Sequence, residues 1–134
     1  MKILLVEDDE VDVMNVKRAF KKNNITNPLT VANNGIEALE YLKGLTDDEL
    51  PKIILLDLNM PLMGGIEFLR ELRSNERTHR ISVFVMTTSN QDNDKIEAFN
   101  LNVAGYILKP LSMERFVQAV STLQSYWTLC EYPE

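Results

Sequence analysis

Cysteine and histidine are scarce in this chain of 134 residues, which contains one of each. The lone cysteine, Cys130, cannot form an internal disulfide, and no cluster of Cys and His has the spacing of a zinc site. Apolar runs are also short, well below the roughly 20 residues that a transmembrane helix needs. The N-terminus lacks the apolar region of a signal peptide. We therefore expect no membrane partner and a cytoplasmic location.

Basic residues are in the minority, because 14 Lys and Arg stand against 20 Asp and Glu and give a formal net charge of −6. Nonspecific nucleic-acid binding depends on basic patches, so we expect no nucleic-acid partner. With 45% hydrophobic residues the chain can still bury a core of its own. We expect one domain over residues 1–134, with no output domain.

Short apolar, β-branched segments alternate along the chain with segments whose apolar residues recur at helical spacing. The first kind predicts five strands: Ile3–Val6, Leu29–Ala32, Ile53–Leu56, Ser82–Met86 and Gly105–Leu108. The second kind predicts five helices, around Val13–Phe20, Ile36–Leu42, Ile66–Leu72, Ile96–Phe99 and Phe116–Trp127. Strict alternation implies parallel strands joined by right-handed crossovers, with helices on both faces of the sheet.

The composition of each strand indicates its place in the sheet. The first, third and fourth strands are apolar almost throughout, as expected of central strands covered on both faces, whereas the second is mixed like an edge strand. The predicted fold is α/β, a doubly wound five-stranded parallel sheet in the order 2-1-3-4-5.

Acidic residues follow two strands that are neighbours in this order. Glu7, Asp8 and Asp9 follow the first strand and Asp57 follows the third, and functional groups in such sheets collect beyond the carboxyl ends of the strands. Two carboxylates about 5 Å apart repel by roughly 3 kcal/mol at an effective dielectric constant near 20. We therefore expect a cation among them. Oxygen ligands without nearby His or Cys favour Mg²⁺, or Mn²⁺, over zinc.

Two further polar residues are expected at the same edge. Lys109 follows the fifth strand and Thr87 the fourth, and an ammonium, a hydroxyl and a metal around a carboxylate suit phosphoryl transfer to that carboxylate. Taken singly, each residue has a plainer explanation, because Asp8 or Asp9 could cap a helix and Lys109 could be a solvated surface lysine. Their joint position at four strand ends favours a functional site.

Four segments resemble the receiver domains of two-component response regulators, the CheY-like family with a flavodoxin-like fold. They are residues 3–9 (ILLVEDD), 55–65 (LLDLNMPLMGG), 85–88 (VMTT) and 105–110 (GYILKP). The resemblance implies a phosphoacceptor at Asp57, although Glu7 stands where the family more often has Asp. It further implies metal ligation by Glu7, Asp8, Asp57 and the backbone carbonyl of Asn59, phosphoryl contacts from Thr87 and Lys109, and a switch formed by Thr87 and Tyr106.

The resemblance also implies a signalling role without enzymatic turnover, apart from self-catalysed phosphotransfer and autodephosphorylation. The phosphoryl donor would be a sensor histidine kinase, and the signal would pass to a downstream protein through the face of the fourth helix, fifth strand and last helix. Three features resemble regulators that serve phytochrome-type kinases: the polar connection 44–51, the Thr-Thr-Ser of residues 87–89, and an aromatic tail. We expect this tail, containing Tyr126, Trp127, Leu129 and Tyr132, to extend the same face in a homodimer.

Three rival functions use the same fold. A flavodoxin-like cofactor carrier needs a phosphate-cradling loop where this chain has the acidic run Glu7–Glu10. A hydrolase with an aspartyl-phosphate intermediate usually has a second acid where Asn59 stands. A degenerate receiver that binds proteins constitutively is the alternative that remains open. We expect His79 to be a solvated loop residue and Gly65 to provide backbone angles closed to other residues.

Overall fold

The computed structural model describes residues 1–109 and 112–129. Its centre is a five-stranded parallel sheet in the order β2-β1-β3-β4-β5, which confirms the predicted topology. Thr87 extends the fourth strand one residue beyond the prediction, because it pairs with Leu108 although its side chain is polar. The strands are β1 (Ile3–Val6), β2 (Leu29–Ala32), β3 (Ile53–Leu56), β4 (Ser82–Thr87) and β5 (Gly105–Leu108).

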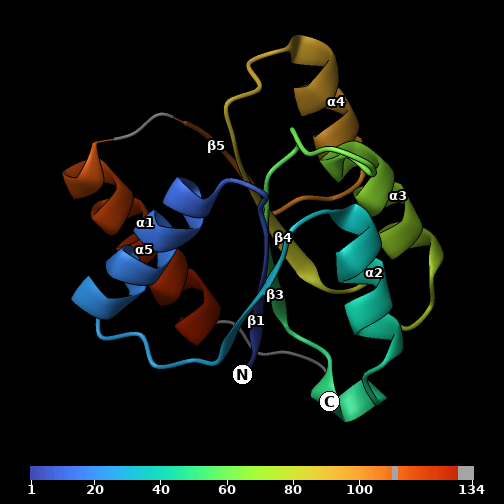
Figure 1. Ribbon diagram of the computed structural model, residues 1–134, viewed down its shortest axis with the longest axis horizontal. Coiled ribbons are helices and arrows are strands. Elements are labelled where there is room, and N and C mark those ends of the chain that lie inside the picture. The colour runs from blue at the N-terminus through green and yellow to red at the C-terminus, as the bar shows by residue number, and fades with distance from the viewer. Residues whose placement is uncertain (110–111, 130–134) are drawn as a thin grey trace.

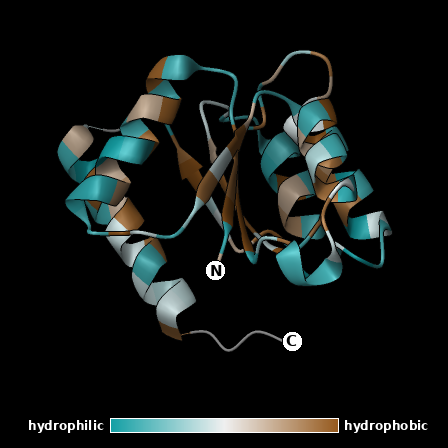
Figure 2. Ribbon diagram, turned by 60° about the horizontal axis from the view of Figure 1, so that its bottom comes forward, coloured by the Kyte–Doolittle hydropathy of each residue, from teal (hydrophilic) through white to brown (hydrophobic). Residues whose placement is uncertain are grey.

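Helices cover both faces of the sheet. The helix bounds are α1 (Glu10–Lys22), α2 (Gly35–Lys43), α3 (Gly65–Ser74), α4 (Asp92–Asn100) and α5 (Met113–Leu129). Helices α1 and α5 lie together on one face, and α2, α3 and α4 lie on the other (Figure 1). Hydrophobic strands occupy the space between these layers, and the outer helix surfaces are mostly hydrophilic (Figure 2). A short 3₁₀ helix, η1 (Asp47–Glu49), occupies part of the predicted polar connection.

Every residue of β1 and β3 is buried. Leu4 and Ile54 belong to the core cluster beneath α2, α3 and α4, whereas Leu5 and Leu55 belong to the cluster beneath α1 and α5. Because both faces of these strands are covered, their sequences are apolar throughout instead of alternating. The two central strands therefore form a rigid platform whose carboxyl ends carry the acidic residues.

Trp127 is part of the core, so the prediction that it belongs to an exposed aromatic tail is wrong. Its side chain is 5% exposed and its ring centroid lies 6.2 Å from that of Phe20 in α1. Trp127 continues the buried stripe of α5 at a spacing of four from Leu123, and this spacing turns it toward the sheet. Tyr126 and Leu129 are exposed. Cys130 and Tyr132 lie outside the described residues.

The start of α1 is fixed by Asp9, which caps the helix. One carboxylate oxygen of Asp9 accepts hydrogen bonds from the backbone N–H groups of Val11 (2.8 Å) and Asp12 (3.3 Å). The capping explanation considered for Asp8 or Asp9 thus holds for Asp9. This cap also fixes the backbone of Asp12 next to the carboxyl edge of the sheet.

The loop from β3 to α3 is tight, but for a different reason from the one predicted for Gly65. No described glycine has a positive φ, and the left-handed position in this loop is taken by Leu62, with φ 66°. Gly65 is needed because a Cβ there would lie 2.6 Å from the backbone oxygen of Asp57. The helix start and the end of β3 thus approach each other too closely for any side chain.

Candidate functional site

Backbone hydrogen bonds extend the sheet just past its strands and position the candidate residues. The N–H of Glu7 donates to Ala32 (2.9 Å), and the N–H of Asp57 donates to Val6 (3.0 Å). On the other side, the N–H of Lys109 donates to the carbonyl of Thr87 (2.7 Å). The predicted residues therefore begin from rigid backbone at one edge, as the strand order requires.

Three carboxylates meet at this edge. Glu7, Asp8 and Asp57 each offer an oxygen, and these atoms lie within 4.8 Å of one another. Glu7 and Asp57 are buried, at 3% and 6% exposure, while Asp8 is exposed. All-oxygen ligands with one side open to solvent suit a hard divalent cation that keeps some of its water. The arrangement can therefore hold a divalent metal ion.

Lys109 supplies a cation from the protein itself. Its side chain is 9% exposed, and Nζ donates to Glu7 Oε2 (2.9 Å) and to Asp12 Oδ2 (2.7 Å), while Asp57 Oδ2 lies 4.0 Å away. A hollow of about 10 Å³ beside these groups is lined mainly by apolar side chains. The ammonium thus partly neutralises a cluster of acids that lies beside buried apolar side chains.

Asp12 is a site residue that the sequence analysis missed. It lies in the first turn of α1, where an acid is common because it favours the helix dipole. One signal was available, since Asp12 precedes the core residue Val16 by four positions and therefore lies on the same face of the helix. Because Asp12 is an acid on the buried side of the helix and close to the predicted acidic edge, the sequence offered a reason to count it among the candidate site residues.

Burial and charge shift the ionisation of the central pair. Burial raises the pKa of Glu7 to about 7, with help from the charge of Asp57, and the hydrogen bond from Lys109 opposes this rise. For Lys109, burial acts to lower the pKa, but hydrogen bonds to Asp12 and Glu7 and the charge of Asp57 outweigh it and raise the pKa. The lysine therefore stays a cation at neutral pH, whereas Glu7 can change its charge there.

Thr87 is fully buried at the end of β4 and is linked to Tyr106 through one intermediate residue. The Oγ1 of Thr87 accepts a hydrogen bond from the N–H of Ser89 (3.2 Å), and the hydroxyl of Tyr106 donates to the carbonyl of Ser89 (2.9 Å). The hydroxyl of Ser89 donates to Asp94, in the first turn of α4. A hydrogen-bonded connection thus runs from Thr87 to α4 and β5.

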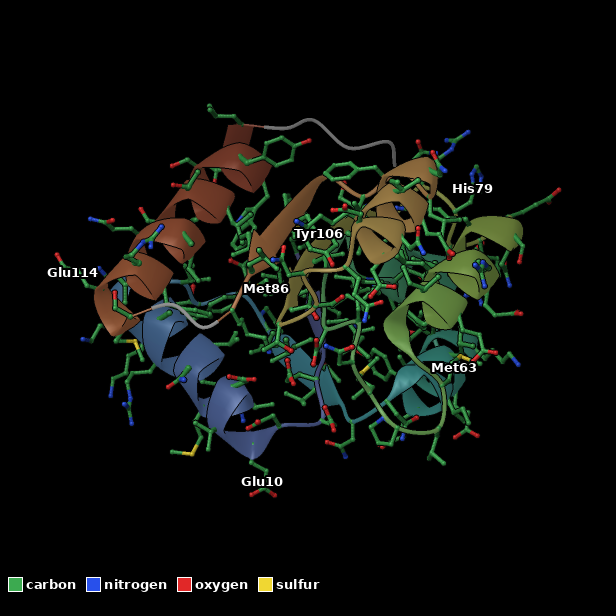
Figure 3. The ribbon with its side chains drawn as sticks, turned by 90° about the horizontal axis from the view of Figure 1, so that it is seen from above. Glu10, Met63, His79, Met86, Tyr106 and Glu114 are labelled. Carbon is green, nitrogen blue, oxygen red and sulfur yellow. The ribbon has the colours of Figure 1, made fainter. Side chains whose placement is uncertain are left out.

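Tyr106 also contacts α4 through its ring. The ring lies 6.4 Å from that of Phe99, with an interplanar angle of 28°, and Tyr106 appears beside α4 in Figure 3. Asn59 follows Asp57 by two residues; its N–H donates to Asp57 Oδ1 (3.2 Å), and its side-chain amide donates to the hydroxyl of Thr88 (3.0 Å). The predicted site residues therefore lie at this edge of the sheet, except Tyr106, which lies within β5 and reaches the edge through its hydroxyl.

A larger hollow, of about 720 Å³, lies between the C-terminal end of α3 and the segments before β3 and β4. Its cations are largely engaged, because Arg73 donates to four backbone carbonyls and Arg77 pairs with Asp47. His79 is exposed there, far from Glu10 in Figure 3. This region contains none of the predicted site residues.

Among the described helices, none is long and apolar enough to cross a membrane.

The fold and the site together define a class of protein. A doubly wound parallel sheet with a buried carboxylate, neighbouring acids, a largely buried lysine side chain and a buried threonine at its carboxyl edge is the arrangement of a receiver module. Residues 3–121 match the model of the response regulator receiver domain family. The chain belongs to this family, whose members are signalling proteins of phosphorylation-based two-component systems and not classical enzymes.

Similar proteins include regulators of several kinds. The probable methanogenesis regulatory protein FilR2 of Methanothrix harundinacea (strain 6Ac) is 37% identical over 127 residues, covering 93% of this chain and 82% of FilR2. Response regulator Rcp1 of Synechocystis sp. (strain ATCC 27184 / PCC 6803 / Kazusa) is 34% identical over 128 residues, covering 93% of this chain and 87% of Rcp1.

Solved structures agree with this family assignment. The crystal structure of the phosphorylated cyanobacterial phytochrome response regulator RcpA has a TM-score of 0.89 and 31% identity, over 99% of this chain and 98% of RcpA. The crystal structure of the Mn²⁺-bound form of Rcp1 has a TM-score of 0.86 and 33% identity, over 98% of each chain. A relative with the same fold thus binds a divalent metal.

Proposed function

We propose that this chain is a single-domain response regulator that accepts a phosphoryl group on Asp57 in the presence of Mg²⁺. The observation that carries the proposal is the position of the Asp57 carboxylate, which is buried, within 4.8 Å of the carboxylates of Glu7 and Asp8, and 4.0 Å from the ammonium of Lys109. Glu7, Asp8, Asp57 and the backbone carbonyl of Asn59 would hold the metal, and their hard oxygens fit it.

The reaction is a displacement at phosphorus. A carboxylate oxygen of Asp57 attacks the phosphorus of a phosphohistidine, the P–N bond breaks, and its electron pair stays on the imidazole nitrogen. The Lys109 ammonium and the Thr87 hydroxyl bind phosphoryl oxygens and orient the group. When bound, Mg²⁺ supplies further positive charge for those oxygens. Hydrolysis of the resulting acyl phosphate returns the protein to its resting state.

The proposed phosphoryl donor is a sensor histidine kinase of the phytochrome type, and the proposed location of the protein is the cytoplasm. This part of the proposal is supported by the likeness to RcpA and Rcp1 along nearly the whole of each chain. The chain turns over no substrate apart from its own phosphoryl group. Its output is a contact with a downstream protein through the face formed by α4, β5 and α5.

The switch runs through Thr87 and Tyr106. When Thr87 moves to a phosphoryl oxygen, its hydrogen bond from Ser89 must change, and Ser89 is the residue that holds both Tyr106 and the start of α4. The α4–β5–α5 face then changes, and a partner that prefers the altered face shifts the population toward it.

A homodimer is the proposed occupant of this face. It exposes Ile96 at 57%, Phe99 at 54% and Leu129 at 83%, while Trp127 contributes to the core of each subunit instead. Ile96 and Phe99 lie three residues apart on α4 and therefore on the same side of that helix, and exposed apolar side chains that lie together are typical of an interaction surface.

Intact mass spectrometry tests the acceptor. After incubation with Mg²⁺ and acetyl phosphate, wild type and the control Asp92→Asn should each gain one phosphoryl group, about 80 Da, and Asp57→Asn should gain none. Asp92 is an exposed acid in the first turn of α4, so its variant has the same change of charge. A folded wild type that gains nothing from acetyl phosphate or from a histidine kinase would instead favour the constitutive binding module.

Sedimentation velocity tests the dimer, with and without Mg²⁺ and beryllofluoride, an analogue of the phosphoryl group. Ile96→Ser should weaken dimerisation. Val11→Ser, which removes a side chain 64% exposed on α1, should leave it unchanged. A wild type that stays monomeric under both conditions, or an Ile96→Ser variant that dimerises as strongly as wild type, contradicts the proposal.

A further inference from the structure

Asp12 holds the Lys109 ammonium from outside the group of residues assigned to phosphorylation and metal binding. Its Oδ2 lies 2.7 Å from Nζ, and its side chain is 31% exposed, so it approaches the buried ammonium from the solvent side. The N–H of Asp12 is itself fixed by the cap residue Asp9. The position of this carboxylate is therefore set by the start of α1 and not by the sheet.

Three acids surround the same ammonium, and their distances from it differ. Nζ lies 2.7 Å from Asp12, 2.9 Å from Glu7 and 4.0 Å from Asp57. The first two are hydrogen bonds, whereas the third exceeds hydrogen-bond range. In the resting site, Lys109 is thus hydrogen-bonded on the side of α1 and makes no hydrogen bond to the proposed acceptor, Asp57.

We propose that Asp12 is a positioning residue that holds Lys109 on the α1 side of the resting site and competes with the phosphoryl group for it. The inference rests on the proposed function, in which Lys109 binds a phosphoryl oxygen. Negative phosphoryl oxygens beside Asp57 attract the ammonium away from the α1 side, and we infer that its hydrogen bond to Asp12 lengthens as a result. A contact present only in the resting state favours that state, so Asp12 opposes the phosphorylated conformation.

The direction of the effect follows from this competition. Replacing Asp12 by Asn keeps the size of the side chain and an oxygen acceptor but removes the charge, so the resting contact weakens. Lys109 then leaves Asp12 at a lower cost. We expect the phosphoryl analogue to bind about fivefold more tightly, which is the effect of roughly 1 kcal/mol. If Asp12 instead held Lys109 ready for the phosphoryl group, the same variant would bind the analogue more weakly.

The experiment is calorimetric titration of beryllofluoride into the protein at saturating Mg²⁺, with a separate Mg²⁺ titration of each variant. The control is Glu10→Gln, which loses the same charge two residues earlier, where Glu10 is exposed and points away from the site (Figure 3). A second control is Asp12→Glu, which restores a carboxylate. Urea unfolding of each variant measures stability separately, because a purely structural role for Asp12 would change stability without tightening beryllofluoride binding.

Tighter binding in Asp12→Asn, with wild-type affinity in Glu10→Gln and at least partial return in Asp12→Glu, supports the inference. Equal or weaker binding in Asp12→Asn overturns it while leaving Asp57 as the acceptor. A wild type that binds no beryllofluoride and also gains no phosphoryl mass overturns the proposed function, and the inference with it.

Discussion

The buried carboxylate of Glu7 should make the metal-free protein less stable as the pH rises through neutrality. Its pKa is 4.5 without the fold and about 7 in the folded chain, mainly because of burial. At pH 5 the folded state keeps Glu7 protonated, whereas the unfolded state has largely ionised it. Above about pH 7 both states are ionised, and the folded protein bears the cost of a buried charge. The stabilisation is therefore complete below pH 4.5 and lost as the pH rises through about 7.

The size of the effect follows from the two pKa values. At about 1.4 kcal/mol for each tenfold change in the ionisation constant, a rise from 4.5 to about 7 corresponds to roughly 3 kcal/mol. The side chain of Glu7 is only 4% exposed, so solvent screens this cost little. The hydrogen bond from Lys109 lowers the pKa of Glu7, but the value of about 7 already includes this effect. Lys109 therefore does not cancel the cost.

Urea unfolding in EDTA at pH 5 and pH 8 measures this difference. Wild type and Glu10→Gln should lose about 2 to 3 kcal/mol of unfolding free energy between these pH values, and Glu7→Gln should lose much less. Added Mg²⁺ should stabilise wild type more at pH 8 than at pH 5, since the metal and the proton compete for the same carboxylate. An equal pH dependence in wild type and Glu7→Gln would refute the assignment of the shift to Glu7.

Three further predictions concern packing and the switch. Trp127→Ala should lower the unfolding free energy by about 3 to 5 kcal/mol in urea, whereas Leu129→Ala should change it by less than about 0.5 kcal/mol; equal effects would contradict the burial of the indole. Gly65→Ala should cost about 1 to 3 kcal/mol and slow phosphorylation, because its Cβ meets backbone. Gly35→Ala, which meets a flexible side chain, should cost less. Thr87→Ala should still accept phosphoryl mass but should lose phosphorylation-dependent dimerisation or partner binding, and retention of that dependence would remove Thr87 from the switch.

The sheet and its order could be predicted because each strand carries its own signal. Central strands covered on both faces are apolar at every position, and β1 and β3 begin and end at the predicted residues. Strand order then brings the ends of β1, β3, β4 and β5 to one edge, so the sequence alone predicts that Asp57 and Lys109 lie together. The 3₁₀ helix η1 was not predicted, because three acidic residues carry no apolar periodicity.

Features that depend on distant contacts could not be predicted in the same way. The sequence alone makes Asp12 an ordinary first-turn acid, and only the packing of α1 against the sheet brings it to Lys109, which is 97 residues away. Trp127 was grouped with an exposed tail by its aromatic neighbours, although its spacing from Leu123 placed it on the buried stripe. Gly65 was assigned a conformational reason when the actual reason is the close approach of Asp57.

Contacts on the two sides of the proposed acceptor, Asp57, connect it to different layers of the molecule. On one side, Lys109 connects the site to α1 through Asp12. On the other, Thr87 connects it to α4 through Ser89. Helices α1 and α4 lie on opposite faces of the sheet (Figure 1) and belong to separate core clusters. A phosphoryl group bound by both Lys109 and Thr87 would therefore act on both faces at once, and the resting hydrogen bonds on each face oppose it independently. Under the proposed function, contacts on two faces of the sheet set the balance between the resting and phosphorylated states, and only one of these faces is the proposed output surface.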